Sequence, residues 1–248
     1  MSRKICICVG HGRNSKGGYD PGAVSADMKY HEHRLAREVA KYAAEYLQCD
    51  LINYDGTLSL NGRIKAVNAG KYDFAVDIHL NAGGGRGTET YYYHGSPTGR
   101  KAADEICGCI SREMDVANRG AKIKMGASGK DYFGFIRLTE PCAVLVETLF
   151  IDNQRDLDKM IAGGGTKKCG EAIGKALEYC FGDNKKYRVI SDGLNIRGGA
   201  GDTKPIVGEL NKDETVTVTV TSPDDRWGRL SDGRGWIRLA LRYVEVID

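Results

Sequence analysis

The sequence predicts an α/β fold with an open, largely parallel twisted sheet and flanking helices, followed by a small all-β barrel. Short apolar runs alternate with segments of helical period as far as residue 181, which is typical of βα units. After residue 186 the pattern changes to period two with closely spaced turns. We therefore expect a first domain over residues 1–181, a polar linker over 182–186 and a second domain over 187–248.

Strands of the first domain are predicted from short runs that are apolar or rich in β-branched and aromatic residues. The expected strands are residues 4–9, 50–54, 73–79, 88–94 and 142–148. Helices are predicted from apolar residues that recur at helical spacing. The expected helices are residues 30–48, 58–70, 98–114 and 167–181. In the second domain, the alternating run VTVTV (216–220) and turn residues at 192–193, 198–201, 222–225 and 231–235 indicate short strands of a small barrel.

Composition excludes several classes of protein. A net charge of +3 without a basic cluster interleaved with aromatic residues does not indicate a nucleic-acid partner. No apolar stretch is long enough to span a membrane, and the N-terminal apolar run ICICV is too short for a signal peptide. Several of the eight Cys lie within apolar runs, which favours buried free thiols and a reducing compartment. We therefore expect the protein to stay in the cytoplasm until another agent releases it.

Four polar residues stand where predicted elements begin or end. His11 follows the first strand, Glu32 opens the first helix, and His79 and Glu147 close later strands. The carboxyl ends of parallel strands form the ligand crevice of an open α/β sheet. Two His and one Glu suit a zinc site with an open position, and a further Glu suits proton transfer. Together these residues predict metal-assisted hydrolysis.

Each of the four residues also has a simpler interpretation. His11 could be a loop residue between glycines, and His79 could be a hydrogen-bonded residue at a strand end. Glu32 could compensate the dipole of a first helical turn, and Glu147 could be a polar stop after a buried strand. The metal interpretation depends on the four side chains meeting in space.

The triplet His31–Glu32–His33 offers more than one candidate ligand. At about 100° per residue, Glu32 lies about 30° from the centre of the apolar stripe, His31 about 70° and His33 about 130°. Glu32 is therefore expected to face inward and His33 to face solvent, while His31 remains a possible ligand.

A series of motifs resembles, in order, those of zinc-dependent N-acetylmuramoyl-L-alanine amidases of the amidase-3 type, over about residues 4–181. The motifs are GHGRNSKGGYDPGA (10–23), the inward Glu32, Arg63 with Asn68, DIHLNAG (77–83), GTETYY (87–92) and AVLVETLFIDN (143–153). The loop between His11 and the Asp-Pro-Gly turn is longer than the usual compact form of the family.

This resemblance implies one zinc ion on His11, Glu32 and His79, with Glu147 as the catalytic carboxylate. It also implies cleavage of the amide between the lactyl group of N-acetylmuramic acid and L-alanine of the peptidoglycan stem peptide. Asn81 and Glu89 match motif positions and are expected to support the site.

The C-terminal segment resembles a bacterial SH3-type domain, through GLNIRGGAGDTKPIVGELNKDETVTV (193–218) and WGRLSDGRGWI (227–237). Domains of that type often bind cell wall, and Tyr187, Trp227 and Tyr243 are the candidate wall-binding aromatics. Core packing is the favoured interpretation of Trp236.

Taken together, these features predict a two-domain peptidoglycan hydrolase, which fits a phage endolysin. A host autolysin of the same chemistry is the first alternative. A wall-binding protein with a catalytically silent amidase-like domain is the second.

Overall fold

The computed structural model describes residues 3–182, 184–222, 224 and 226–247. Residue 183 of the expected linker, residues 223 and 225 of the expected turn, and the terminal residues 1, 2 and 248 lie outside the described residues. The chain forms two compact units, one over Arg3–Leu177 and one from Glu178 onward, so the division falls within helix α6 (Gly165–Phe181). Lys185 and Lys186, expected in a linker, lie instead in strand β9 (Lys185–Val189).

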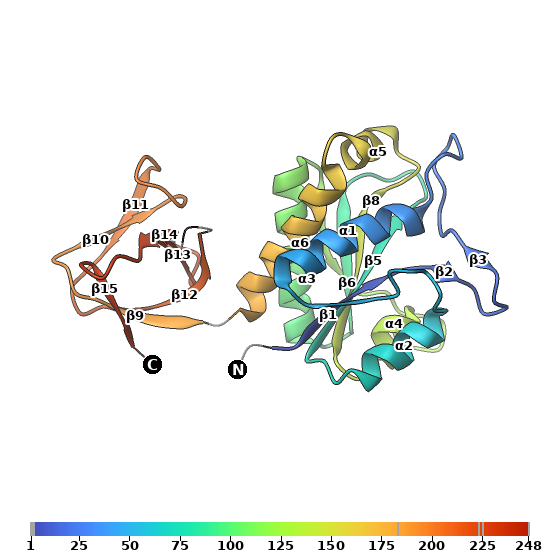
Figure 1. Ribbon diagram of the computed structural model, residues 1–248, viewed down its shortest axis with the longest axis horizontal. Helices are drawn as coiled ribbons and strands as arrows, with labels where there is room; N and C mark the ends of the chain where they lie inside the picture. Colours follow the sequence, from blue (N-terminus) through green and yellow to red (C-terminus); the bar gives the residue numbers. More distant parts are fainter. Residues whose placement is uncertain (1–2, 183, 223, 225, 248) are drawn as a thin grey trace. The chain divides into compact units, whose positions relative to one another are not determined.

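The first unit contains a six-stranded sheet in the order β4-β1-β5-β8-β6-β7 (Figure 1). The strands are β1 (Ile5–Val9), β4 (Asp50–Ile52), β5 (Phe74–Asn81), β6 (Thr88–Tyr92), β7 (Asn118–Lys122) and β8 (Cys142–Phe150). Strands β4, β1, β5 and β8 are parallel, whereas β6 runs antiparallel to β8 and parallel to β7. The largely parallel sheet is thus confirmed, with a reversed pair of strands at one edge.

Helices flank the sheet, as expected (Figure 1). They are α1 (Glu32–Leu47), α2 (Leu60–Ala69), α3 (Pro97–Met114), α4 (Gly134–Leu138), α5 (Gln154–Ile161) and α6. Helix α1 contacts β1 and β5, and α3 contacts β6 and β8. Helix α6 approaches α1 closely at Gly170, where a Cβ atom would lie 2.5 Å from the carbonyl oxygen of Val39.

The site lies on the sheet face that α2 and α4 cover. Ala75 and Ala143 pair across β5 and β8 and belong to a buried cluster with Phe135 of α4 and residues of α2. Side chains two residues apart on a strand share a face. His79 and Glu147, which also pair across β5 and β8, therefore lie further along the same face, toward the carboxyl ends of the strands.

The sequence pattern did not predict five of the described elements of the first unit. These are the hairpin strands β2 (Gly12–Arg13) and β3 (Tyr19–Asp20), together with β7, α4 and α5. The hairpin strands, α4 and α5 are too short to show a clear period, and β7 (NRGAK) lacks the apolar or aromatic character of the strands that were predicted. Among the described residues, no helix combines the length and apolar character that crossing a membrane requires.

The second unit contains an antiparallel seven-stranded sheet in the order β11-β10-β14-β13-β12-β9-β15. Its other strands are β10 (Leu194–Arg197), β11 (Ile206–Leu210), β12 (Thr215–Thr221), β13 (Trp227–Leu230), β14 (Trp236–Arg238) and β15 (Val244–Ile247). Aliphatic residues such as Val189, Ile196 and Leu210 form its core. The expectation of an all-β C-terminal segment is confirmed, and its SH3-type identity stays a prediction.

Candidate active site

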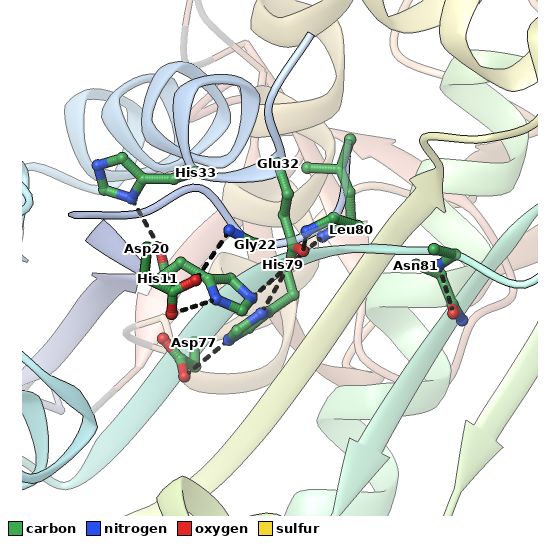
Figure 2. A network of polar contacts seen from close by, with 12 residues as sticks. His11, Asp20, Gly22, Glu32, His33, Asp77, His79, Leu80 and Asn81 are labelled. Carbon is green, nitrogen blue, oxygen red and sulfur yellow. Dashed lines mark hydrogen bonds and ion pairs between the residues drawn. The ribbon is translucent and has the colours of Figure 1, made fainter. Parts of the chain in front are cut away.

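His11, Glu32 and His79 meet at the carboxyl end of the parallel strands, although up to 68 positions separate them in the chain (Figure 2). One ligand atom from each lies within 4.8 Å of the others. His11 follows β1 in a left-handed conformation with φ of +60°, which is uncommon for a residue other than glycine. Strained backbone of this kind recurs at functional sites, where surrounding contacts hold it in place.

Glu32 is the centre of this cluster and is 4% exposed. Its Oε1 atom lies 3.1 Å from Nε2 of His11 and 2.9 Å from Nδ1 of His79. Backbone N–H groups of Leu80 and Ala23 donate to its two carboxylate oxygens. Burial opposes the charge, but the two imidazoles hold the pKa of Glu32 well below its usual range. The carboxylate is therefore ionised and ready to bind a cation.

A second carboxylate fixes each imidazole ring from its far side. Oδ2 of Asp20 lies 3.0 Å from Nδ1 of His11, and Oδ2 of Asp77 lies 3.0 Å from Nε2 of His79 (Figure 2). Asp77 is in turn 3.4 Å from the guanidinium of Arg63. Carboxylates in this position orient metal-ligating His and fix the tautomer.

The charges of the two imidazoles respond to these carboxylates. Burial lowers the pKa of His79, but Asp77 and Glu32 outweigh it and raise that pKa to about 10. The pKa of His11 is also raised, because its hydrogen bonds to Glu32 and Asp20 outweigh burial. The carboxylates around the two rings therefore favour positive charge at this site.

Sequence reasoning missed Asp20 and Asp77 as parts of the site, although both carried a signal. Asp77 lies two residues before His79 on one strand and hence on the same face. Asp20 ends the short strand β3 and is the first residue of the Asp-Pro-Gly turn, and its side chain contacts His11.

Glu32 faces inward, as its helical angle predicts, but His33 does not face solvent and that prediction is wrong. His33 is 4% exposed, and its Nδ1 atom lies 2.8 Å from the carbonyl oxygen of Gly10. The loops at Gly12 and Gly56 cover the first turn of α1 and enclose this ring, so the outer side of that turn is not solvent. His31 is the N-cap residue of α1 and is not in the group of possible metal ligands, which leaves Glu32.

Glu147 lies beside the cluster, because it pairs with His79 on the neighbouring strand. Its Oε2 atom is buried and has no hydrogen-bond partner among the described residues. Burial raises the pKa of Glu147 to about 7. A carboxyl group with this pKa can both accept and donate a proton near neutral pH.

Glu89 lies on β6, on the side of Glu147 away from His79, and Asn81 at the end of β5 reaches it. Glu89 pairs with Glu147 across β6 and β8, and Nδ2 of Asn81 donates to its Oε1 atom at 2.8 Å. Glu89 is 3% exposed and also binds Arg119 and Lys122 of β7. Burial opposes its charge, but these cations lower the pKa of Glu89 to about 2.

A cavity of about 420 Å³ opens beside His11 and His79. Its lining comes from the loop after β1, from α2 and α4, and from β5 and β8. Phe133 and Leu145 give it an apolar wall, and hydroxyl and amide groups such as those of Ser59 and Asn61 line another part. The cavity is therefore suited to a substrate with both apolar and hydrogen-bonding surfaces.

Residues 5–179 match the amidase-3 family, whose members are described as N-acetylmuramoyl-L-alanine amidases. This chain belongs to that family. It is 31% identical over 212 residues to the sporulation-specific N-acetylmuramoyl-L-alanine amidase of Bacillus subtilis, a match that covers 79% of this chain and 77% of that relative. The endolysin of Bacillus phage SPP1 is 25% identical, with 99% of each chain covered.

Solved structures agree with the family assignment. Cwp6 from Clostridium difficile matches with a TM-score of 0.65 and 32% identity over 72% of this chain, which spans only 29% of Cwp6. The catalytic domain of the CD27L endolysin matches with a TM-score of 0.57 and 26% identity, covering 71% of this chain and 96% of that domain. The α/β fold of this amidase is thus the fold of known amidases and endolysins.

The candidate wall-binding aromatics of the second unit differ in their placement. Tyr187 is 7% exposed and belongs to the core, so the expectation of a surface aromatic is wrong there. Trp227 is also buried, with the guanidinium of Arg238 5.4 Å from its ring centroid. Tyr243 is half-buried beside Arg242, and Trp236, expected in the core, is half-buried as well.

Proposed function

We propose that this amidase cleaves the bond between the lactyl group of N-acetylmuramic acid and L-alanine of the peptidoglycan stem peptide with one zinc ion. The observation that carries the proposal is the convergence of His11, Glu32 and His79. Two imidazole nitrogens and one carboxylate oxygen form a donor set that suits catalytic zinc. When bound, zinc would polarise the amide carbonyl and lower the pKa of a water molecule.

Glu147 carries the proton in this proposal. Its carboxylate accepts a proton from the attacking water as the oxygen bonds to the amide carbon. It then donates that proton to the amide nitrogen as the C–N bond breaks. The products are a lactyl carboxylate and a stem peptide with a free amino group on L-alanine. The buried Oε2 atom and the pKa near 7 support this role.

The test is the release of new amino groups from purified peptidoglycan by the full chain. We expect release that stops when a chelator removes the metal and resumes when zinc is restored. Release that persists after removal of the metal would contradict the zinc mechanism. No release under any condition would favour the silent wall-binding protein.

We further propose that the second unit is an SH3-type domain that holds the enzyme on the wall. Two hollows of about 500 and 340 Å³ share Asp202, Trp227 and Arg238, and the second also includes Tyr243. Aromatic rings beside guanidinium groups suit stacking and hydrogen bonding with a glycan or peptide. Loss of cosedimentation of the full chain with purified wall after Tyr243→Ala would support this role.

A phage lysis role is the biological setting that we favour. The match to the SPP1 endolysin spans 99% of both chains. In this setting the enzyme waits in the host cytoplasm and reaches the wall after the membrane is permeabilised. Expression in a Gram-positive host should therefore leave cells intact until a permeabilising agent is added. Lysis without that agent would favour the autolysin, an alternative supported by the sporulation-specific relative at 31% identity.

A further inference from the structure

Two cations beside the active site remain without a role in the proposed chemistry. We propose that Arg119 and Lys122 bind a carboxylate of the stem peptide, two or three residues beyond the scissile amide. This inference rests on the proposed function, because it assigns the peptide side of the same substrate.

The cations are held in place by Glu89, whose carboxylate is saturated with donors. Its Oε1 atom accepts from Nδ2 of Asn81 and the hydroxyl of Tyr91, both at 2.8 Å. Its Oε2 atom accepts from Nε of Arg119 at 2.5 Å and Nζ of Lys122 at 2.6 Å. A carboxylate with four donors is a fixed anchor and not a proton carrier, so Glu89 is a positioning residue.

The anchor leaves binding capacity on both cations. Arg carries five N–H donors and Lys three, and the bonds to Glu89 use one of each. The side chains of Arg119 and Lys122 are 36% and 33% exposed, so donors can reach a ligand. The single negative charge of Glu89 faces the two positive charges of Arg119 and Lys122, so the three side chains carry a net charge of +1 that can attract a second anion. Charge-assisted bonds to a carboxylate are the strongest that these donors make.

The position of the cations fits the peptide side of the substrate. His79, Glu147 and Glu89 pair in a row across three neighbouring strands. At about 4.8 Å per strand, the Glu89 position lies about 10 Å from that of His79. An extended peptide covers about 3.4 Å per residue, so this distance corresponds to about three residues.

The two sides of Glu147 differ in chemistry, which gives the substrate a direction. The 420 Å³ cavity, with Ser59, Asn61 and Phe133, lies on the side of β1, α2 and α4. Its hydroxyl, amide and aromatic groups suit a sugar, and the charges of Arg13 and Arg63 in its lining are matched by those of Asp20 and Asp77. The basic pair lies on the side of β6 and β7, where the carboxylates of the peptide would arrive.

The test compares three soluble muramoyl tripeptides with the full chain. One has free carboxylates on its second and third residues, one has a carboxamide on the second, and one has a carboxamide on the third. We expect at least one amidation to lower kcat/KM about ten-fold or more through KM, because charge-assisted bonds are lost. In the double variant Arg119→Gln/Lys122→Gln, the three substrates should be cleaved at similar rates.

The ratio of kcat/KM between the free and the amidated substrates distinguishes loss of carboxylate recognition from loss of structure. Unfolding or a shifted strand would lower kcat/KM for all three substrates together. The exposed ion-paired Lys167 provides a matched loss of charge, and Lys167→Gln should keep the wild-type ratio. Equal kcat/KM of the wild type for the three substrates would overturn this inference and leave the proposed function standing. The same holds if the double variant still prefers the free carboxylates over the carboxamides. Cleavage of none of the three by the wild type would overturn the proposed function, and the inference with it.

Discussion

His79 and Glu147 occupy paired positions on the neighbouring parallel strands β5 and β8. The pairing places an expected metal ligand and the expected proton carrier side by side on one sheet face, where a single water molecule can meet both. The arrangement follows from register alone, because a shift of one residue would turn Glu147 to the opposite face.

The first prediction concerns Glu147. Glu147→Gln keeps the shape of the side chain but cannot accept the proton, so turnover should fall about 10²–10⁴-fold or more. Zinc content and sedimentation with wall should be unchanged, as measured by metal analysis and a wall pull-down. The exposed Glu140, near the start of β8, supplies the control variant Glu140→Gln. Turnover like that of the wild type in Glu147→Gln would remove Glu147 from its role.

The second prediction concerns the carboxylate behind His11. Asp20→Asn should weaken zinc binding about 10–100-fold, because the ring of His11 loses its orienting partner. Competition with a chromophoric chelator measures this affinity, and excess zinc should restore activity. The control variant Asp192→Asn, at an exposed ion pair, should change neither the zinc affinity nor the activity. An unchanged zinc affinity in Asp20→Asn would show that the contact does not support the metal.

The third prediction concerns the space around His79. A Cβ atom at Gly10 would lie 2.4 Å from Cε1 of that ring, closer than real Cβ atoms approach. Gly10→Ala should therefore displace the ring and lower both zinc affinity and turnover by at least about ten-fold. Displacing a catalytic group by about 1 Å can cost about 10²-fold in rate, so ten-fold is a lower bound. Gly163 has open space around its Cβ position, so Gly163→Ala is the matched control. Equal activity of the two variants would contradict the close approach of Gly10 to His79.

The fourth prediction concerns stability against pH at Glu89. The folded-state pKa of about 2 lies below the ordinary value of 4.5, so the charged form is favoured by folding. Its contribution, at most about 3 kcal/mol, is present above pH 4.5 and lost as the pH falls toward 2. The difference in unfolding free energy between wild type and Glu89→Gln should therefore shrink between pH 6 and pH 2.5. A difference independent of pH would show that Glu89 gains nothing from its two cations.

The fifth prediction separates two tyrosines of the second unit. Tyr187 lies in the core, so Tyr187→Ala should cost about 3 kcal/mol of unfolding free energy and shift the second unit's thermal transition. Tyr243 is half-buried beside Arg242, so Tyr243→Ala should cost less and chiefly weaken wall binding. Calorimetry and cosedimentation of the full chain measure the two effects. Equal loss of stability in both variants would argue that Tyr243 is structural.

The sequence predicted the central strands and long helices because their patterns are strong. Strand β1 is a continuous apolar run, and α1 carries a clear apolar stripe that oriented Glu32 correctly. Strand direction at the β6–β7 edge was not accessible, since a period-two pattern does not reveal which way a strand runs.

The errors at His33 and Asp20 have one physical origin, the contacts of segments distant in the sequence. A helical angle describes a helix alone, whereas His33 is buried because distant loops at Gly12 and Gly56 cover that turn. The same reasoning applies to Asp20, whose partner His11 is reached only after the β2–β3 hairpin folds back. Tyr187 was misplaced because the alternation of β9 is consistent with either face of a strand.

Mass spectrometry of a peptidoglycan digest tests the central claim most directly. Digestion with the full chain should yield stem peptides that begin with a free L-alanine amino group, together with glycan strands that carry intact lactyl carboxylates. These products should disappear in Glu147→Gln and after removal of the metal. New amino groups within the stem or on its cross-links, or new reducing ends on the glycan, would contradict the assignment of the scissile bond.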